Sequence, residues 1–406
     1  MIFQKIKTDP GPAPDGGMTA WLQVVAGVLI NALTWGYSSS FGVYQLYYTT
    51  ALSLPPSQVS WIGSTQVFLT FFISAFSGRS ADAGLAQQTV LLGCFLGVFG
   101  TLMTSLATKY WQIFLAQGIC TGLGMGLMYM PTVAIISSYF QKKRGLALTT
   151  SASGSGLGSI VFPLVLQNLQ DKIGFSWAVR IQAIIALLFA VIILTLLQPR
   201  LPPRTAGPII ELRAFHEASY SLFTIGMFFI FLALYFAFFY INSYATTVIG
   251  VSSETAATFL VIINAITIPS RPLLGYFSDR WFNALLTLAL ASMFMAFMLF
   301  IWIPVKTLGG MYAWVAIYGF ATGGTQGMFS GALASLTHDP AKMGTRFGMV
   351  CSVLAFASLA GPPIAGGLIE SMNGSFVGAQ AWAGAVTLMG SLFITAARWS
   401  DRKALH

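Results

Sequence analysis

The residue with the clearest chemical potential is Arg271, which lies inside an apolar stretch within Pro269-Ser270-Arg271-Pro272. A charged side chain at membrane depth costs about 3 kcal/mol even on the mildest insertion scale, so such residues often mark functional sites. A guanidinium offers a planar fork of donors that suits a carboxylate. Two interpretations are open: Arg271 binds an anionic ligand, or it reaches the membrane interface or makes a structural pair.

Polar, uncharged and aromatic side chains in other apolar stretches suit a pocket for a larger amphipathic organic molecule. Beside Arg271 we predict these as candidate binding residues: Asn31, Trp35, Tyr37, Ser39, Ser40, Gln66, Asn264, Gln326 and Phe329. Each of them also suits a hydrogen bond between helices or a position at the membrane interface. The sequence leaves both roles open for each residue.

The elements that must position these residues are membrane-spanning helices. Of the 406 residues 56% are hydrophobic and only 8% are charged, too few charges to cover a soluble protein of this length. About twelve apolar stretches approach the ~20 residues that cross a bilayer. The predicted spans are 20–46, 58–79, 88–107, 111–137, 145–167, 177–197, 219–241, 255–277, 283–304, 311–335, 344–369 and 379–398. We therefore predict an all-α integral membrane protein.

The positive charges orient these spans. With the N-terminus inside, sixteen of the twenty Lys and Arg fall on that side, and only Lys109, Lys172, Arg180 and Lys306 fall outside. Because basic loops resist translocation, both tails, 1–19 and 399–406, are predicted to be cytoplasmic. The net charge of +9 then reflects cytoplasmic loops facing anionic lipid headgroups, and it does not indicate nucleic-acid binding.

A polar linker and an internal repeat divide the chain into halves. The segment 198–218 is rich in Pro and charged residues, and it separates a half at 20–197 from a half at 219–398. Gly78 is followed four positions later by Asp82, and Gly275 is followed in the same way by Asp279, which precedes Arg280. Asp279 follows Asp82 by 197 positions, about half the chain. Duplicated halves of this kind are typical of secondary transporters.

Several classes of chemistry lack their residues. Cys94, Cys120 and Cys351 all lie in apolar stretches without metal-ligand spacing, so they are predicted to be small buried side chains. We find no nucleophile–base pair and no glycine-rich phosphate loop. The sequence therefore predicts no catalytic residue, no metal site and no cofactor, and it argues against an enzyme.

The repeated Gly-xxx-Asp loops at the ends of the second and eighth spans resemble those of the major facilitator superfamily. That resemblance implies twelve helices in two pseudo-symmetric six-helix halves and transport by alternating access. In the family this loop packs against neighbouring helix ends and helps hold one face closed, which carries over here to Asp82, Asp279 and Arg280. The first copy departs from the family pattern, because Ala83 stands where a basic residue is usual.

Three further stretches resemble the monocarboxylate-transporter branch, especially its fungal members. They are Asp15-Gly16-Gly17 with Trp21, the stretch 139–147 with its basic cluster ending at Arg144, and the stretch 344–349 with Arg346. The resemblance implies gating or conformational roles for Asp15, Arg144 and Arg346, and Asp15 also suits a plain cap of the first helix. We expect the small residues at 151–158 to pack against a matching surface on the predicted span 111–137, made by Gly118, Gly122 and Gly126.

The resemblance also implies that Arg271 binds a substrate carboxylate. Proton-coupled members carry an Asp where Thr267 stands and a Lys near Ser39 or Ser40, so the usual proton relay is missing here. We expect a transporter that works by alternating access and moves a small organic acid or an acid-bearing amphipathic metabolite, with export of a fungal specialised metabolite as the favoured direction. Uptake of a monocarboxylate or nutrient is the alternative, and a membrane sensor that does not transport is a further one.

The expected surroundings follow from the same resemblance. The expected partners are a small organic substrate and the lipid bilayer, and the protein is expected to act as a monomer in the plasma membrane. The sequence names neither the substrate, the direction of transport, the coupling ion nor an accessory subunit.

Overall fold

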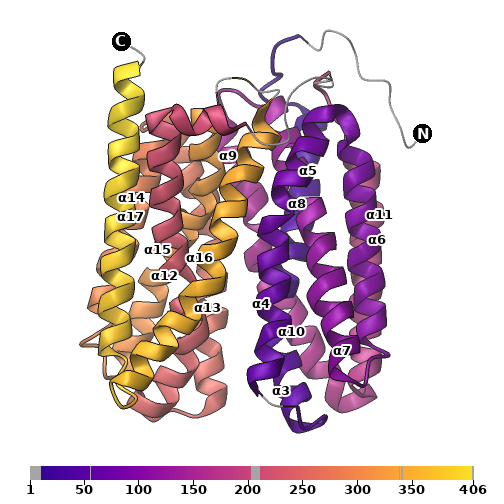
Figure 1. The fold of residues 1–406 in the computed structure, drawn as a ribbon, viewed down its shortest axis with the longest axis vertical. Helices are drawn as coiled ribbons and strands as arrows, with labels where there is room; N and C mark the ends of the chain where they lie inside the picture. The colour runs from indigo at the N-terminus through magenta and orange to yellow at the C-terminus, as the bar shows by residue number, and fades with distance from the viewer. Residues whose placement is uncertain (1–10, 55, 203–210, 338, 340–341, 405–406) are drawn as a thin grey trace. The chain divides into compact units, whose positions relative to one another are not determined.

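A computed structural model describes residues 11–54, 56–202, 211–337, 339 and 342–404, and helices dominate this part of the chain (Figure 1). The chain divides into two compact units. Unit 1 comprises Met1–Glu211 with Asp339–Ala355, and unit 2 comprises Leu212–His338 with Phe356–His406. The predicted tails and the predicted linker 198–218 lie partly outside the described residues.

Unit 1 holds the helices of the first six predicted spans. In chain order they are α1 (Met18–Asn31), η1 (Ala32–Gly36), α2 (Tyr37–Ser39), α3 (Phe41–Thr50), α4 (Pro56–Phe72), α5 (Ser74–Ser80), η2 (Ala81–Leu85), α6 (Ala86–Thr104), α7 (Tyr110–Ile113), η3 (Phe114–Thr121), α8 (Gly122–Tyr139), α9 (Arg144–Ala152), α10 (Gly154–Ile173) and α11 (Phe175–Leu196). The η segments in this list are π-helical turns. Such turns occur often at functional sites, and η1 carries Trp35.

The turn between the second and third spans depends on one glycine. Gly84 lies in η2 with φ of 84°, a left-handed conformation that residues with a Cβ adopt only at a cost. It reverses the chain after α5, two residues beyond Asp82. The backbone geometry of this turn therefore favours a glycine at position 84.

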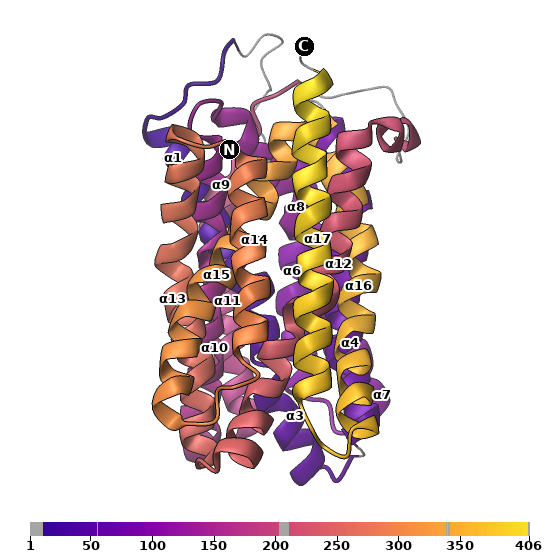
Figure 2. The ribbon, with the colours of Figure 1, turned by 90° about the vertical axis from the view of Figure 1, so that its left-hand side faces the viewer.

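Unit 2 holds the remaining helices. In chain order they are η4 (Leu212–His216), α12 (Ala218–Tyr244), η5 (Ala245–Ile249), α13 (Ser253–Arg280), α14 (Ala284–Ile301), α15 (Leu308–Leu336), α16 (Met343–Ser371) and α17 (Val377–Ala404). Within this unit α12 and α14 both pack against α17, and α13 packs against α15 (Figure 2). The start of α16, as far as Ala355, belongs to unit 1.

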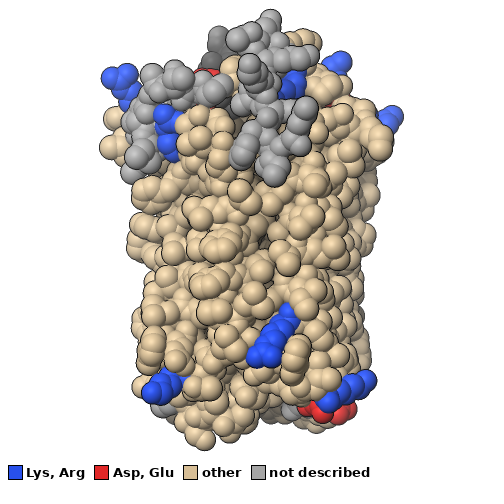
Figure 3. Space-filling model, turned by 90° about the vertical axis from the view of Figure 1, so that its right-hand side faces the viewer, with Lys and Arg blue, Asp and Glu red and all other residues tan. Residues whose placement is uncertain are grey.

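In the described part of the chain, nine helical spans are long and apolar enough to cross a membrane. The number is below twelve partly because Gln58–Thr104 counts as one span through η2. Two further predicted spans, those of α10 and α15, are not among the nine. Their many Gly and Ser residues lower their hydropathy while allowing close packing. On the face drawn in Figure 3, Lys and Arg gather mainly toward two ends, and the band between them is largely uncharged.

Candidate functional site

Arg271 is almost completely buried in α13, with 4% of its surface exposed. Its Nη2 donates a 3.0 Å hydrogen bond to Oε1 of Gln326 in α15. The Gln326 amide nitrogen donates at 3.2 Å to Oγ1 of Thr322, one turn earlier on α15. Because a guanidinium only donates, it must face the carbonyl oxygen of Gln326, which turns the amide NH₂ toward Thr322. The structure therefore brings two predicted binding residues together.

Glycines allow α13 to approach α15 closely enough for this contact. Three of them recur every four residues along α15: Gly319, Gly323 and Gly327. A Cβ at Gly319 would lie 3.0 Å from the Ile263 carbonyl oxygen, and a Cβ at Gly327 would lie 2.8 Å from Arg271 Cγ. Both distances are tighter than ordinary Cβ contacts, so the stripe lets the helices pack backbone to backbone. Sequence reasoning missed this stripe, although its spacing is visible in the sequence.

The same packing joins the second and fourth spans in unit 1, through the glycines predicted as a packing surface. A Cβ at Gly118 would lie 3.3 Å from the Ile62 carbonyl oxygen, and a Cβ at Gly122 would lie 3.1 Å from that of Gln66. Gly319 follows Gly118 by 201 positions, and Ile263 follows Ile62 by the same 201. At this offset Thr70 of α4 corresponds to Arg271 of α13.

The predicted partner of Gly118, Gly122 and Gly126 is wrong, although close packing at these glycines is confirmed. The small residues of α10 pack on the first span and not on the fourth span, which holds these glycines. A Cβ at Gly158 would lie 2.5 Å from the Ala32 carbonyl oxygen, and a Cβ at Gly154 would overlap the Val28 carbonyl oxygen. Four-residue spacing reveals that a helix face is flat, but it does not say which neighbour occupies that face.

The polar candidates of the first span make contacts that pack it against the fifth. Asn31 donates to the Gly27 carbonyl at 2.9 Å and to Ser151 Oγ at 3.3 Å. Ser39 Oγ lies 2.7 Å from Ser159 Oγ. These groups are therefore used in helix packing, and a role in binding for them stays a prediction.

Two more candidates of the first span are buried in its second half. Tyr37 OH lies 3.1 Å from Tyr44 OH, which donates at 2.5 Å to Oε1 of Gln182 in α11. Ser40 is fully buried, and its Oγ has no hydrogen-bond partner among the described residues. The Tyr37 contact fixes the helix against its neighbours, so Tyr37 is a packing residue in this geometry.

An aromatic and thioether surface surrounds Trp35 and Gln66 in unit 1. The Trp35 ring lies 4.6 Å from the Phe71 ring, and it meets Tyr129 edge-on at 5.7 Å. Gln66 is 1% exposed, and its amide nitrogen lies 3.4 Å from Sδ of Met125. Thioether sulfur is a weak acceptor, so this amide keeps most of its hydrogen-bonding capacity.

The two other candidates of unit 2 lie on the same helices as Arg271 and Gln326. Asn264 in α13 is half-buried and donates to the Leu260 carbonyl of its own helix at 3.0 Å. Phe329 in α15 is 3% exposed, and its ring stacks with that of Phe223 at 6.2 Å. These contacts stay within the helix or the aromatic core, and binding roles for both residues stay predictions.

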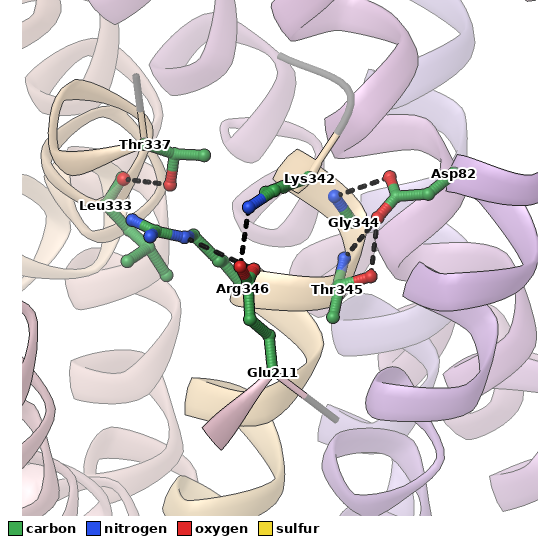
Figure 4. Close-up of polar contacts among 8 residues, drawn as sticks. All are labelled: Asp82, Glu211, Leu333, Thr337, Lys342, Gly344, Thr345 and Arg346. Carbon is green, nitrogen blue, oxygen red and sulfur yellow. Dashed lines mark hydrogen bonds and ion pairs between the residues drawn. The ribbon is translucent and has the colours of Figure 1, made fainter. Parts of the chain in front are cut away.

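Asp82, a predicted gating residue, caps the start of α16. Its carboxylate accepts hydrogen bonds from the backbone N–H of Gly344 at 2.9 Å and of Thr345 at 2.7 Å, and from the Thr345 hydroxyl at 2.6 Å (Figure 4). Asp82 is 8% exposed, so a buried anion meets the positive end of a helix dipole. Gly78 fits against Gly344 at this point, since a Cβ on Gly78 would overlap the Gly344 carbonyl oxygen.

A second acidic residue holds the same helix start, and sequence reasoning gave it no role. Glu211 Oε1 forms an ion pair with Lys342 Nζ at 2.6 Å (Figure 4). Its Oε2 lies 3.8 Å from Nε of the predicted gating residue Arg346. The side chains of Glu211 and Arg346 are 14% and 9% exposed. The sequence shows Glu211 as a charged residue in a Pro-rich linker, but this pattern does not predict which residue it contacts.

Asp15 does not cap the first helix, as one interpretation expected. The N-cap of α1 is Gly17, without a side-chain hydrogen bond. The Asp15 carboxylate instead accepts from the backbone N–H of Gln141 at 2.5 Å and of Lys142 at 2.7 Å, in the turn before α9. Asp15 therefore holds the turn before α9, whose backbone N–H groups precede the helix itself.

The residues around this turn hold it further. Arg144 Nε donates to the Phe140 carbonyl at 3.0 Å, and the Trp21 ring meets Phe140 edge-on at 5.3 Å. Two of the stretches that carry the monocarboxylate-transporter resemblance therefore contact each other within unit 1. This contact was not predicted from their sequences.

The second Gly-xxx-Asp loop is arranged differently from the first. Asp279 and Arg280 are exposed at the end of α13. Arg280 Nη1 donates at 2.6 Å to the hydroxyl of Tyr276, and its guanidinium lies 5.8 Å from the rings of Tyr276 and Trp281. This arginine is therefore held by aromatic residues of its own segment.

The chemistry available in the described residues is that of binding. Among them no group of three or more His, Cys, Asp or Glu side chains could hold a metal ion. Cys94, Cys120 and Cys351 are free thiols, and two of the three are buried. Within unit 2 the group that can act on a ligand is the buried guanidinium of Arg271, whose contact with Gln326 is to a neutral oxygen. Within unit 1 it is the aromatic surface around Trp35.

Comparisons with known proteins agree on one kind of molecule. The Major Facilitator Superfamily profile matches residues 24–362. An MFS-type transporter of Gibberella zeae is 38% identical over 98% of this chain and 90% of its own length. The aspyridones efflux protein apdF of Emericella nidulans is 34% identical over 95% of this chain and 79% of its own length. The crystal structure of the human organic anion transporter MFSD10 aligns with a TM-score of 0.72 at 17% identity, covering 93% of this chain and 98% of that one.

Proposed function

The chain belongs to the major facilitator superfamily, and we propose that this transporter exports an amphipathic organic acid from a fungal cell. Members of the family are transporters rather than enzymes, and they move small molecules through a multi-pass membrane fold. Twelve-helix transporters of this kind expose a site near the middle of the bilayer to each side in turn.

The observation that carries the proposal is the buried Arg271. A buried guanidinium favours negative charge nearby, and the Gln326 oxygen that contacts it is neutral. A cargo carboxylate would supply the charge through a two-point contact. Within unit 1, Trp35 and Gln66 form an aromatic surface with few polar groups, which suits an amphipathic molecule.

Export is favoured by the similarity to fungal relatives. One of them is named as an efflux protein for aspyridones, and it is 34% identical to this chain over 95% of this chain's length. The absence of an Asp at Thr267 supports a site that does not use the proton relay of lactate-type carriers.

The conformational part of the proposal centres on the start of α16. We assign a gating role to Asp82, which would release and recapture the N–H groups of Gly344 and Thr345 during each cycle. Arg346, through Glu211, would strengthen the closed form. Asp15 and Arg144 would hold the turn before α9. Asp279 and Arg280 would act at the corresponding loop of unit 2.

The finer placement of the protein is also part of the proposal. The motifs at Asp15, Arg144 and Arg346 support a monocarboxylate-porter-like branch. The distribution of Lys and Arg supports cytoplasmic ends, since basic loops stay inside. We propose the plasma membrane as the location, because export of a cargo from the cell requires it. We propose that one copy of the chain is sufficient for transport.

A deletion strain tests this function. Metabolites in cells and in medium are quantified after deletion of the gene and after complementation with the wild type, Arg271→Ala or Thr70→Ala. We expect an organic acid to accumulate inside the deletion strain and to return to the medium with the wild type and Thr70→Ala. Arg271→Ala should reduce its export by about a hundredfold, as loss of a charge-assisted contact implies.

Thr70 is the matched control because it holds the position of Arg271 in the first unit and is equally buried. An acid that stays in the medium of the deletion strain and no longer enters cells would show uptake instead. An unchanged acid profile in both compartments would contradict transport of an acid, and full export by Arg271→Ala would remove Arg271 from the site.

A further inference from the structure

The amide of Gln326 has one possible orientation beside Arg271. The guanidinium carries only donors, so Oε1 of Gln326 faces it at 3.0 Å. The amide nitrogen then faces Thr322 Oγ1 at 3.2 Å, and this hydroxyl accepts the hydrogen bond. Thr322 is fully buried, which fixes the orientation of the whole chain of contacts. Gln326 thus places Arg271 through an oxygen that carries no formal charge.

The packing around this contact limits how Arg271 can move. Gly327 follows Gln326, and a Cβ there would lie 2.8 Å from Arg271 Cγ. The arginine stem therefore lies against the backbone of α15, and the head group meets Gln326. A side chain placed so tightly keeps its charge at a fixed position.

The charges on the elements packed against α13 complete the setting. Helices α12, α14 and α15 and the turn η5 contact α13, and none of them contains Asp, Glu, Lys, Arg or His. Their ionisable residues are tyrosines: Tyr220, Tyr235, Tyr240, Tyr244, Tyr312 and Tyr318. On α13 itself, Glu254 and Asp279 lie 17 and 8 positions from Arg271. A rise of about 1.5 Å per residue puts the nearer of them about 12 Å along the helix.

We propose that Gln326 is a specificity-determining residue, which holds Arg271 in place with a neutral oxygen so that its positive charge selects a cargo carboxylate over an uncharged group of the same shape. The proposal rests on the proposed function, since it takes Arg271 as the anion-binding residue. Glutamate is nearly the same size as glutamine, but it would place a negative charge at the same 3.0 Å contact. It would neutralise Arg271 from within and compete with the cargo.

Binding to the purified full-length protein tests this role with two aromatic probes of equal shape, 2-naphthoate and 2-naphthamide. Titration calorimetry gives both affinities for the wild type, Gln326→Glu, Gln326→Leu and Arg271→Gln. The wild type should prefer the carboxylate by about tenfold or more, the effect of one charge-assisted contact. Gln326→Glu should reduce this preference to about one. Gln326→Leu should weaken 2-naphthoate by about threefold to tenfold and keep the preference, because the charge remains while its placement is lost.

Each outcome decides the matter. A preference kept in Gln326→Glu, or a wild type that binds both probes equally, overturns the proposal. The melting temperature without ligand shows whether Gln326→Glu folds. If it does not fold, Gln326→Leu and Thr322→Val provide the test. Unchanged affinity for 2-naphthoate in both variants overturns the proposal, and weakened affinity supports it. If Arg271→Gln keeps the preference, the proposed site fails, whereas loss of preference in Arg271→Gln but not in Gln326→Glu refutes only the role of Gln326.

Discussion

The α4 helix of unit 1 and the α13 helix of unit 2 are packed in the same way but carry different chemistry. Each lies against a glycine stripe of four-residue spacing, and the two stripes are 201 positions apart. At the matching place α4 has Thr70, whose hydroxyl donates to the Gln66 carbonyl of its own helix at 2.8 Å, and α13 has Arg271. The duplicated halves therefore share their packing, while the charge that can select a cargo occurs in one copy.

The helix ends reverse this asymmetry. Asp82 of unit 1 is buried and caps the start of α16, whereas Asp279 of unit 2 is exposed. Thr70 precedes Asp82 by 12 positions and Arg271 precedes Asp279 by 8, so unit 1 has four more residues, about one helical turn, between the matched helix position and the loop. This extra turn coincides with the break between α4 and α5 at Ile73. The buried loop carboxylate and the buried helix guanidinium therefore occur in different units.

The largest effect is expected at the two acidic loops. Asp82→Ala should destabilise the start of α16 by about 3 kcal/mol, because three donors lose a charged acceptor. Hydrogen exchange of the Gly344 and Thr345 amides, followed by mass spectrometry, should then rise strongly. Asp279→Ala should leave exchange at these amides unchanged. Equal exchange in the two variants would contradict the assigned difference between the loops.

A smaller effect should separate the two glycine stripes. A Cβ at Gly126 would meet the Leu69 carbonyl oxygen at 2.8 Å, and backbone cannot move away easily. Gly126→Ala should therefore cost about 1–3 kcal/mol of stability through overpacking. At Gly327 the obstacle is the flexible Arg271 side chain, so Gly327→Ala should lower the melting temperature less and weaken 2-naphthoate binding several-fold. The account would be wrong if Gly126→Ala weakened binding more than Gly327→Ala did at equal stability.

The sequence predicted the membrane helices well, because burial in lipid demands long apolar runs. The ends of predicted spans such as 177–197 and 283–304 agree with α11 and α14 to within a few residues. The pairing of Arg271 with Gln326 could not be predicted, since it depends on the register of two helices 55 positions apart. The target of Asp15 was missed for the same reason: its carboxylate reaches residues 126 positions away. Periodicity specifies a helix face, and only packing specifies its partner.

The smallest effect is expected for the ion pair at the linker. Glu211→Gln removes the charge that meets Lys342 and Arg346. The effect should be about 1 kcal/mol, because the Lys342 side chain is 33% exposed and the contact with Arg346 is long at 3.8 Å. The melting temperature of Glu211→Gln should be slightly lower than that of the wild type. High salt should remove this difference, because it screens the ion pair in the wild type. Arg280→Gln in unit 2 should be equally mild, since its guanidinium contacts aromatic rings near solvent. A large loss of stability in Glu211→Gln would mean that this pair, rather than Asp82, holds the start of α16.

The most direct test of the central claim, that Arg271 supplies the charge selectivity of transport, uses the exported acid and its methyl ester. Proteoliposomes containing the wild type, Arg271→Gln or Thr70→Ala are assayed for transport of both compounds. The account predicts a strong preference for the acid in the wild type and in Thr70→Ala, and no preference in Arg271→Gln. A preference for the acid that survives in Arg271→Gln would contradict it.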